Sequence, residues 1–527
     1  MVKSLLLGID IGTSGCKVTA FDFEGTVLGS ESVAYETFYP SPGHVEQDSE
    51  TWWVAACQGI RAVMGKAALA PGTIAAIGVD GTSWACLPVD GMGRPLRQAM
   101  LWLDRRAEKQ AQWMQEVLGE ELLIGVSGNP VDPAYITPKM LWLKEREPGI
   151  YLAAHKFLQS NAFIVHKLTG VFSQDYSQGY GFHFFNISNG AWEEKIADAL
   201  GLDLNLVASL SHCHEVVGEV TGKAAEETGL APGTPVVAGG LDAACSTLGA
   251  GVMHAGQTQE QGGQAGGMSI QVDRPLIHPK LILGFHVLPD QWLLQGGTVG
   301  GGGALRWFAE QLGEAERMQG RNKGLSAFAV MDAEAAAIGP GSDGLIFLPY
   351  MAGERSPIWD SRAKGVFFGL SYGKTRAHMV RALMEGVGFS LLHNLETAAE
   401  AGAVATELRG VGGAANSRLW TQIKADITGK VFVIPHADHA TTLGAALLAG
   451  IGVGVYRDFA EAVARTVRVQ RTHVPSPENN KLYRQYYDLY RRLYETLKDC
   501  CVKLHEIEET AGVAGEGKGM RGKNRPG

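Results

Sequence analysis

One local pattern recurs along this chain: a short apolar run of β-strand type ends at an acidic residue or a glycine pair, and a tight turn follows. Between these runs lie longer stretches with the 3.6-residue periodicity of amphipathic helices. Strands that alternate with helices predict an α/β protein with layered sheets. Four runs carry the pattern: Leu5–Ile11 before Gly12-Thr-Ser-Gly15, Ile74–Val79 before Asp80-Gly81, Pro235–Ala238 before Gly239-Gly-Leu-Asp242, and Glu407–Val411 before Gly412-Gly413.

The acid–glycine turn occurs near residue 10 and again near residue 242, which indicates two halves built on one plan. A second strand, Lys17–Phe23, is expected to form a hairpin around the first turn. Helices are predicted at Glu50–Lys66, Arg105–Leu118, Arg376–Ala401, Ser417–Thr428 and Glu478–Glu506.

Composition excludes several classes of protein. The net charge of −9 leaves no electrostatic footprint for nucleic acid or an anionic membrane surface. No apolar stretch is long enough to span a bilayer, and the apolar run near the N-terminus is too short for a signal peptide. The seven scattered cysteines contain no CxxC pair, so we expect reduced thiols in a cytoplasmic protein rather than disulfides or zinc.

Glycine is the unusual residue, with 69 among 527 residues, and abundant apolar side chains argue against disorder as its explanation. The turn after the first strand places Asp10 beside exposed backbone N–H groups and two hydroxyls. Glycine lets a polyanion approach the backbone closely, so this turn suits a triphosphate with Mg²⁺. The alternative is an ordinary tight hairpin. The same two interpretations apply to Gly262–Gly267 and Gly412–Ser417.

Asp242 at the end of the third run is a sharper candidate. Such an acid could take the proton from a substrate hydroxyl as the hydroxyl attacks phosphorus. The alternative is that Asp242 only caps the helix that follows. The P-loop pattern GxxxxGK[ST] is absent, a dinucleotide-binding interpretation of Gly410-Val-Gly412 is weak, and no GxSxG nucleophile turn is found in a hydrolase-like context.

Several ordered segments together resemble the FGGY family of carbohydrate kinases, and the resemblance extends from about Leu5 to about Leu497. The segments that carry it are Leu7-Gly-Ile-Asp-Ile-Gly-Thr-Ser-Gly15, His44-Val-Glu-Gln-Asp48 with Trp52-Trp53, Ile136-Thr-Pro-Lys-Met-Leu-Trp142, Pro349–Asp360, Gly365-Val-Phe-Phe-Gly-Leu370 with His378–Glu385, and Gly412–Trp420.

This resemblance implies two ribonuclease-H-like domains of the actin, hexokinase and sugar-kinase type, with an interdomain cleft that holds ATP and a sugar. Residues 1–250 would form the sugar-binding domain, 251–505 the ATP-binding domain, and 506–527 a flexible tail. It implies Asp242 as catalytic base and Asp10 as the acid that orients Mg²⁺. The implied ATP-binding residues are Gly12, Thr13, Ser14, Gly263, Gly302, Gly413, Ala414, Asn416 and Ser417; the implied sugar-binding residues are Ser83, Trp84, Trp102, Asp104 and Asp242.

The substrate that the resemblance implies is a small open-chain sugar, with D-xylulose as the leading candidate. Because homodimers are common among relatives, the resemblance also implies a homodimer. Three departures from xylulokinases bear on it. Ser83 and Trp84 stand where those enzymes carry a Met-His pair, and Ala243 replaces the usual asparagine after the catalytic acid. The loop Gly263-Gln-Ala-Gly266 lacks the usual hydroxyl residue. Ribulokinase-type or other polyol kinases therefore stay open, as do an actin-like ATPase switch and a catalytically weak sugar sensor; glycerol kinase is disfavoured.

Overall fold

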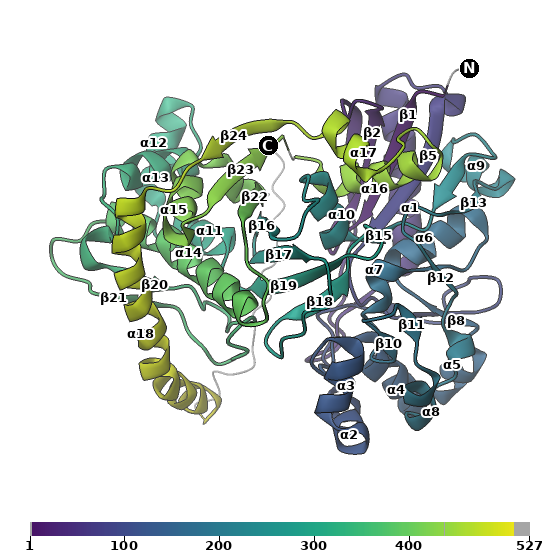
Figure 1. The fold of residues 1–527 in the computed structure, drawn as a ribbon, viewed down its shortest axis with the longest axis horizontal. Coiled ribbons are helices and arrows are strands. Elements are labelled where there is room, and N and C mark those ends of the chain that lie inside the picture. Colours follow the sequence, from purple (N-terminus) through teal and green to yellow (C-terminus); the bar gives the residue numbers. More distant parts are fainter. Residues whose placement is uncertain (1–2, 437, 511–527) are drawn as a thin grey trace.

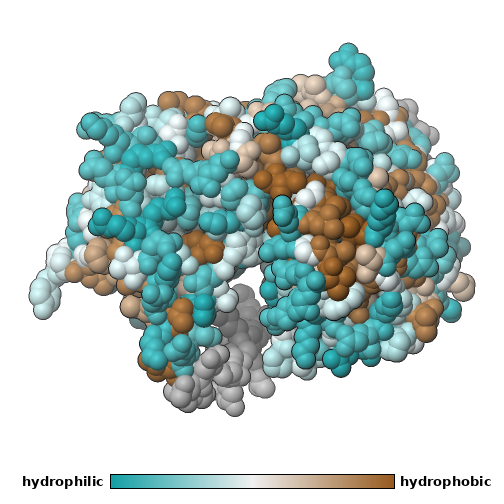
Figure 2. Space-filling view, turned by 60° about the horizontal axis from the view of Figure 1, so that its bottom comes forward, coloured by the Kyte–Doolittle hydropathy of each residue, from teal (hydrophilic) through white to brown (hydrophobic). Residues whose placement is uncertain are grey.

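Two seven-stranded sheets, each covered by helices, make up the computed structural model, which describes residues 3–436 and 438–510 (Figure 1). Figure 2 shows that hydrophilic residues cover much of the face seen there, around a hydrophobic patch on the right-hand lobe. No helix within these residues combines the length and apolar character needed to cross a membrane.

The first sheet has the strand order β13-β14-β5-β1-β2-β3, with β15 beside β5. Its first three strands form an antiparallel meander, and β5 and β14 then add in parallel. The strand bounds are β1 Leu5–Ile11, β2 Gly15–Asp22, β3 Val27–Ala34, β5 Ile74–Gly81, β13 Val216–Glu219, β14 Pro235–Val237 and β15 Gly240–Leu241.

The second sheet repeats this arrangement in the order β18-β19-β17-β16-β22-β23-β24. Here β16 and β17 form the antiparallel hairpin, and β22 and β23 add in parallel. The strand bounds are β16 Gln257–Gly262, β17 Gly266–Val272, β18 Ile282–Phe285, β19 Trp292–Thr298, β22 Glu407–Val411, β23 Val431–Pro435 and β24 Val469–His473.

The common order shows that two halves share one plan, but one predicted correspondence is wrong. The turn at Asp242 is not the second copy of the turn at Asp10. Strand β15 pairs with β5 in the first sheet, and the second copy begins at β16. The true counterpart of Asp10-Ile-Gly12 is Gln261-Gly-Gly263. The strands β1, β5 and β15 all end at one edge of the same sheet. Acidic residues at these strand ends therefore recur within one half and do not mark a second copy.

The helices of the first half surround its sheet and build the smaller layers beside it. Their bounds are α1 Ser49–Lys66, α2 Glu108–Leu118, α3 Glu120–Ser127, α4 Ile136–Arg146, α5 Pro148–Ala153, α6 Ser160–Thr169, α7 Tyr176–Gly179, α8 Glu194–Ala199, α9 Gly222–Thr228 and α10 Asp242–Gly249. Short two-stranded pairs complete this half: β4 Glu46–Gln47 with β7 Ala99–Met100, β6 Leu87–Val89 with β8 Lys156–Leu158, β9 Gln174–Asp175 with β12 Leu210–Ser211, and β10 Phe185–Asn186 with β11 Ala191–Trp192.

The helices of the second half are α11 Gly302–Gln311, α12 Glu314–Lys323, α13 Ala327–Ala336, α14 Arg376–Glu400, α15 Arg418–Thr428, α16 Ala440–Gly452, α17 Phe459–Thr466 and α18 Pro477–Thr510, with β20 Ile346–Leu348 paired to β21 Val366–Phe368. The five predicted helices are confirmed near their predicted positions. Helix α18 continues past residue 505, where Glu508 pairs with Lys364, so residues 506–510 are helical rather than a tail. The rest of the predicted tail, 511–527, lies outside the described residues.

Helix α16 comes from the C-terminal half of the sequence but packs on the first sheet, against β1, β5 and α10 (Figure 1). Glycines make this approach possible. A Cβ on Gly8 of β1 would lie 2.0 Å from the carbonyl oxygen of Thr442, and one on Gly78 of β5 would lie 1.9 Å from that of Ala445. On the other side of the helix, Gly444 meets the backbone of α10 equally closely. Part of the glycine excess therefore serves helix packing, not phosphate.

The hydrophobic core has three main clusters. One belongs to the outer layer of the first half, beneath α1 and α6, and another to the second half, beneath α14, α15 and α18. The largest joins residues of both sheets with α10 and α16. The two halves are therefore linked through a shared core at the base of the cleft.

Candidate active site

Three aspartates meet where the strands of the first sheet end. Asp10 at the end of β1 is in register with Asp80 at the end of β5, and Gly240 of β15 is the next partner of Asp80. Asp242 follows as the first residue of α10. Asp80 is completely buried, whereas Asp10 and Asp242 are partly exposed. Sheet geometry thus gathers three carboxyl groups at the floor of the cleft.

Burial raises the pKa of both members of the Asp10–Asp80 pair. For Asp80 the negative charges of Asp10 and Asp242 add to burial and hold its pKa well above the ordinary value. For Asp10 the shift is opposed by a hydrogen bond from Asp80 and by the charge of Lys17. No N–H or hydroxyl group within the described residues donates to either oxygen of Asp80. Burial and the neighbouring negative charges therefore favour the protonated form of Asp80.

Asp242 has the properties of a general base. Burial raises its pKa to about 7, with the negative charge of Asp10 as the second cause. The backbone N–H of Ala243 donates to Asp242 Oδ1 at 2.6 Å, which orients the carboxylate and partly offsets the shift. A carboxyl group with a pKa near neutrality can both take and return a proton at physiological pH.

The acids also fit Mg²⁺, which binds proteins through one or two carboxylates together with substrate phosphates. Asp10 offers partly exposed carboxylate oxygens, and Asp80 offers buried ones that lack a donor. Across residues 3–436 and 438–510 there is no cluster of three or more His, Cys, Asp or Glu side chains with the geometry of a complete metal site. A site of this kind therefore needs phosphate oxygens as further ligands.

The turn after β1 is held by backbone and side-chain contacts. The N–H of Gly12 donates to the carbonyl of Gly15 at 3.1 Å, and Gln47 donates to the carbonyl of Thr13 at 2.7 Å. Thr13 Oγ1 accepts a hydrogen bond of 3.1 Å from Trp102 Nε1. Ser14 is exposed. The hydrogen bond between Thr13 and Trp102 joins the predicted phosphate turn directly to the predicted sugar wall.

A cavity of about 490 Å³ lies in the second half, where β16 and β22 end and α11 and α15 begin. Six of the predicted ATP-binding residues line it: Gly263, Gly302, Gly413, Ala414, Asn416 and Ser417. Phe328 and Asp332 of α13 complete its wall and were not predicted. A second cavity, of about 180 Å³, shares Gly263 with it and is also lined by Asp10 and Lys17. The shared Gly263 places the two cavities next to each other, the larger in the second half and the smaller at Asp10.

The loop that lacks the usual hydroxyl residue is anchored to α11. The N–H of Gly302 donates to the carbonyl of Gly263 at 2.8 Å, and that of Gly303 donates to Gln264 at 2.9 Å. Ser417 Oγ accepts from the N–H of Trp420 at 2.9 Å, so this hydroxyl caps α15. Backbone groups and shape, more than hydroxyl side chains, define this pocket.

On the sugar side, Trp84 has an unusual conformation. Its φ of 58° lies in the left-handed region, and its ring stacks on Tyr135 with 4.1 Å between centroids. Its indole Nε1 is buried without a partner in the described structure. Tyr180, which sequence reasoning missed, has its ring centre 5.8 Å from that of Trp84. A strained aromatic residue at a strand end is typical of a functional position.

Asp104 and Trp102 differ in what they present to the cleft. Asp104 is fully buried, and its carboxylate accepts from the N–H of Val45 at 2.6 Å and binds Arg106 at 2.7 Å. We therefore interpret Asp104 as a residue that positions its loop rather than as a direct sugar ligand. Trp102 faces Arg355, whose guanidinium carbon lies 5.6 Å from the centre of its ring.

Arg355 is a further functional candidate that sequence reasoning missed. It comes from the second half, and its guanidinium makes no hydrogen bond or ion pair with the residues that the structure describes. Its signal was its place in the segment Pro349–Asp360. Asp80 had a signal too, since it precedes a glycine after a buried strand. Phe328 and Asp332 had none, because they stand in an ordinary helical pattern.

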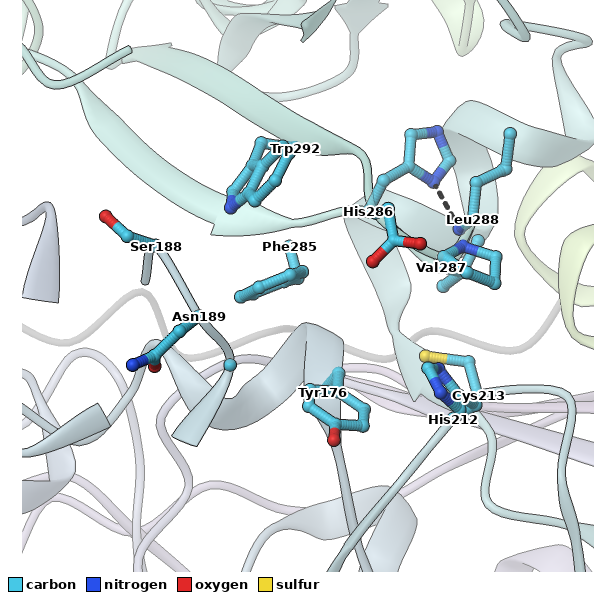
Figure 3. Close-up of a pocket in the computed structure, with 13 residues that line it drawn as sticks. Tyr176, Ser188, Asn189, His212, Cys213, Phe285, His286, Val287, Leu288 and Trp292 are labelled. Atoms are coloured by element: carbon cyan, nitrogen blue, oxygen red, sulfur yellow. Dashed lines mark hydrogen bonds between the residues drawn. The ribbon is translucent and has the colours of Figure 1, made fainter. Parts of the chain in front are cut away.

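Another cavity, of about 280 Å³, lies between the two halves but away from the acids (Figure 3). Tyr176, His212 and Cys213 approach it from the first half, while Phe285 and Trp292 flank it from β18 and β19. It shares no lining residue with the 490 Å³ cavity of the second half or with the 180 Å³ cavity at Asp10.

Comparison with known proteins agrees with the geometry of the site. The model of the FGGY family of carbohydrate kinases, N-terminal domain, matches residues 5–249, and that of the C-terminal domain matches residues 275–453. A xylulose kinase of Staphylococcus epidermidis is 32% identical over 509 residues, covering 96% of this chain and 100% of that protein. A gluconokinase of Bacillus licheniformis is 28% identical, covering 94% of this chain and 97% of that protein. The crystal structure of xylulose kinase from Rhodospirillum rubrum matches with a TM-score of 0.84 at 28% identity, covering 94% of this chain and 99% of that one.

Proposed function

Because this chain belongs to the FGGY family of carbohydrate kinases, we propose that it transfers the γ-phosphoryl group of ATP to a hydroxyl of D-xylulose, giving xylulose 5-phosphate and ADP. The observation that carries the proposal is Asp242, a partly buried, oriented carboxylate with a pKa near 7. It lies beside two further acids, of which Asp10 lines the 180 Å³ cavity next to the cavity of the second half.

Asp242 performs the proton transfer. Its carboxylate accepts the proton of the sugar hydroxyl as that oxygen attacks the γ-phosphorus, and the bond to the ADP oxygen breaks. The hydrogen bond from Ala243 holds Oδ1 in place, so that one carboxylate face is presented to the acceptor. A positioned base of this kind contributes about 10²–10⁴-fold to the rate.

Asp10, with Asp80 behind it, would hold Mg²⁺ against the phosphates. When bound, Mg²⁺ supplies positive charge that stabilises the charge developing on the transferred group. Lys17 lines the same small cavity and donates to the carbonyl of Asp438 at 2.8 Å. Thr13 and Ser14 present hydroxyls from the turn after β1, and Gly12 allows close approach of phosphate oxygens.

The nucleotide binds in the cavity of the second half. Ala414 and Phe328 offer apolar contact to a purine base, whereas Asn416 and Asp332 offer polar groups for ribose or base. Gly263, Gly302 and Gly413 leave room for the phosphates. The sugar lies opposite, against Trp84 and Trp102, with Ser83 and Tyr180 as hydrogen-bonding groups.

A second candidate substrate is D-gluconate. Arg355 projects beside the Trp102 wall without an anionic partner in the described structure, and a guanidinium pairs well with a carboxylate. A gluconokinase is among the relatives. Neutral ketoses would meet the same guanidinium through hydroxyl groups, so this feature distinguishes the two candidates by charge alone.

The test follows ADP production with Mg²⁺-ATP and D-xylulose, D-ribulose, D-gluconate or glycerol as acceptor. We expect the largest kcat/KM with D-xylulose, and sugar-dependent ADP release well above the rate without acceptor. A higher kcat/KM with D-gluconate, reduced specifically by Arg355→Gln, would select the second candidate. Release of ADP that no acceptor increases would favour the ATPase switch instead.

The homodimer and the cytoplasmic location expected from the sequence are also part of this proposal. Light scattering after gel filtration tests the first, and the mass of a single 56.3 kDa chain would contradict it.

A further inference from the structure

Lys139 is buried in an unusual manner. It lies on α4, inside the segment Ile136–Trp142, and its side chain has no exposed surface. Buried lysines normally pair with a carboxylate. Lys139 forms no ion pair in the described structure, and donates to two backbone carbonyls instead, that of Trp84 at 2.9 Å and that of Leu101 at 2.6 Å.

These two carbonyls belong to the two loops that carry the aromatic wall of the sugar side. Trp84 follows β5, and Leu101 follows β7 and directly precedes Trp102. Backbone pairing between Cys86 and Met100 also joins the two loops, with N–H to carbonyl distances of 2.9 and 3.1 Å. At the aromatic residues themselves, the Trp84 N–H donates to Gln159 at 3.2 Å and Trp102 Nε1 donates to Thr13 at 3.1 Å. The ammonium group of Lys139 adds a side-chain link between Trp84 itself and the residue that precedes Trp102.

We propose that Lys139 is a positioning residue that fixes the distance between Trp84 and Trp102 and thereby sets the affinity for the sugar. The inference rests on the proposed sugar site. Trp84 needs such support because its left-handed backbone conformation is unfavourable for a bulky residue. A charge-assisted hydrogen bond to its carbonyl holds this conformation while the ring stays stacked on Tyr135.

The charge of Lys139 depends on its surroundings. Burial lowers its pKa to about 8, while Cys86, Asp104 and Asp132 favour the charged form and Arg106 opposes it. Above this pH the group loses a proton and its two hydrogen bonds weaken. The KM for the sugar should therefore rise with pH above about 8, whereas the KM for ATP should not follow it.

Lys424 provides the matched comparison in the second half. It too has no exposed surface, but it is paired with the carboxylate of Glu260 at 2.5 Å and lies near the nucleotide cavity, over Trp420. Lys424→Met combined with Glu260→Gln removes a buried lysine without leaving a charged partner behind. This double variant should leave the KM for the sugar unchanged.

The experiment uses the acceptor with the highest kcat/KM in the substrate panel, so failure of the D-xylulose assignment does not affect it. Lys139→Met should raise the KM for the sugar about tenfold or more, with the KM for ATP nearly unchanged, because two charge-assisted hydrogen bonds are lost. The alkaline rise in the KM for the sugar should disappear. Lys139→Gln keeps donors without a titrating charge, and should show an intermediate KM with no alkaline rise.

Two results would overturn the proposal. One is an equal effect of Lys139→Met on the KM for sugar and the KM for ATP, as a merely structural residue would give. The other requires no variant: a wild-type KM for the sugar that stays constant between pH 7 and pH 9.5. The second measurement decides the matter even if Lys139→Met fails to fold. If no acceptor stimulates ADP release at all, the proposed function fails, which is a different outcome.

Discussion

The two halves of the molecule have the same strand order but opposite chemistry at the strand ends that face the cleft. In the first half, Asp10 and Asp80 are the last residues but one of β1 and β5, and Gln261 holds the position of Asp10 in the second half. In the second half, the counterpart strands β16 and β22 run into Gly262-Gly263 and Gly412-Gly413. One sheet edge therefore supplies carboxylates, and the other supplies open backbone.

The two strand ends therefore suit different parts of phosphoryl transfer. Carboxylates suit the reacting end, where a proton is removed and a metal is oriented. Glycines suit the nucleotide end, where backbone must approach a bulky polyanion without side chains between. The two halves share one fold but differ in a few residues at their strand ends. The fold therefore presents one kind of surface to the sugar and another to ATP.

The largest expected effect is at the reacting end. Asp242→Asn keeps the shape of the side chain but removes the base, so kcat should fall by about 10²–10⁴-fold while the KM for ATP changes little. Circular dichroism serves as the folding control. A kcat within threefold of the wild-type value would show that Asp242 is not the base that removes the proton.

The ionisation of Asp242 gives the wild-type enzyme an acid limit. The base must be deprotonated, and burial with the charge of Asp10 places its pKa at about 7. Below this pH, kcat/KM should therefore fall tenfold per pH unit, and above it kcat/KM should reach a plateau until Lys139 titrates. A profile that is flat from pH 5.5 to pH 7.5 would contradict this assignment.

Two glycine substitutions separate packing from ligand binding. Gly8→Ala places a Cβ 2.0 Å from the Thr442 carbonyl oxygen, and should destabilise the protein by about 1–3 kcal/mol by forcing α16 from β1. The midpoint of unfolding of this variant in urea, compared with that of the wild type, measures the effect. An unchanged midpoint would mean that α16 is not tightly held.

Gly413→Ala is the matched variant at the nucleotide end. A Cβ there meets no atom within 4 Å, and Gly413 lines the nucleotide cavity. The midpoint in urea should stay unchanged, while the KM for ATP rises about tenfold, equivalent to about 1.4 kcal/mol. If ATP binds equally well to this variant, the open backbone of the second half does not serve the nucleotide.

The smallest expected effect concerns the stability that the protein loses by burying Asp80 beside Asp10 and Asp242. The folded protein keeps Asp80 protonated far above 3.8, whereas the unfolded chain ionises it near that value. The folded state therefore binds more protons, and stability decreases as pH rises from 3.8 toward the raised pKa. Asp80→Asn removes this loss, so with EDTA present its Tm should exceed that of the wild type by about 2–4 °C at pH 7 but not at pH 4. An identical difference at both pH values would contradict the raised pKa of Asp80.

Sequence reasoning could predict what local patterns encode. The strand runs, the five helices and the family motifs at Asp10, Asp242 and Gly412 each lie within short segments. It could not predict that α16 leaves its own half, because that packing depends on contacts between residues 367 and 434 positions apart, Gly78 with Ala445 and Gly8 with Thr442. It likewise did not select Asp332, which stands in an ordinary helical pattern, or Arg355, although Arg355 lies in a family segment. The sugar-binding role of Asp104 stays a prediction, and its carboxylate pairs with Arg106 of the same short motif.

The crossing of α16 has a practical consequence for anyone who wishes to cut this protein into pieces. A fragment ending at residue 250 would contain the first sheet but lack the helix that covers β1 and β5, and would expose a glycine-lined apolar groove. A fragment starting at residue 251 would carry α16 with no surface to rest on. Co-expressed, the two fragments should find each other through this groove, so the chain offers a natural basis for a split enzyme whose activity reports the meeting of its parts.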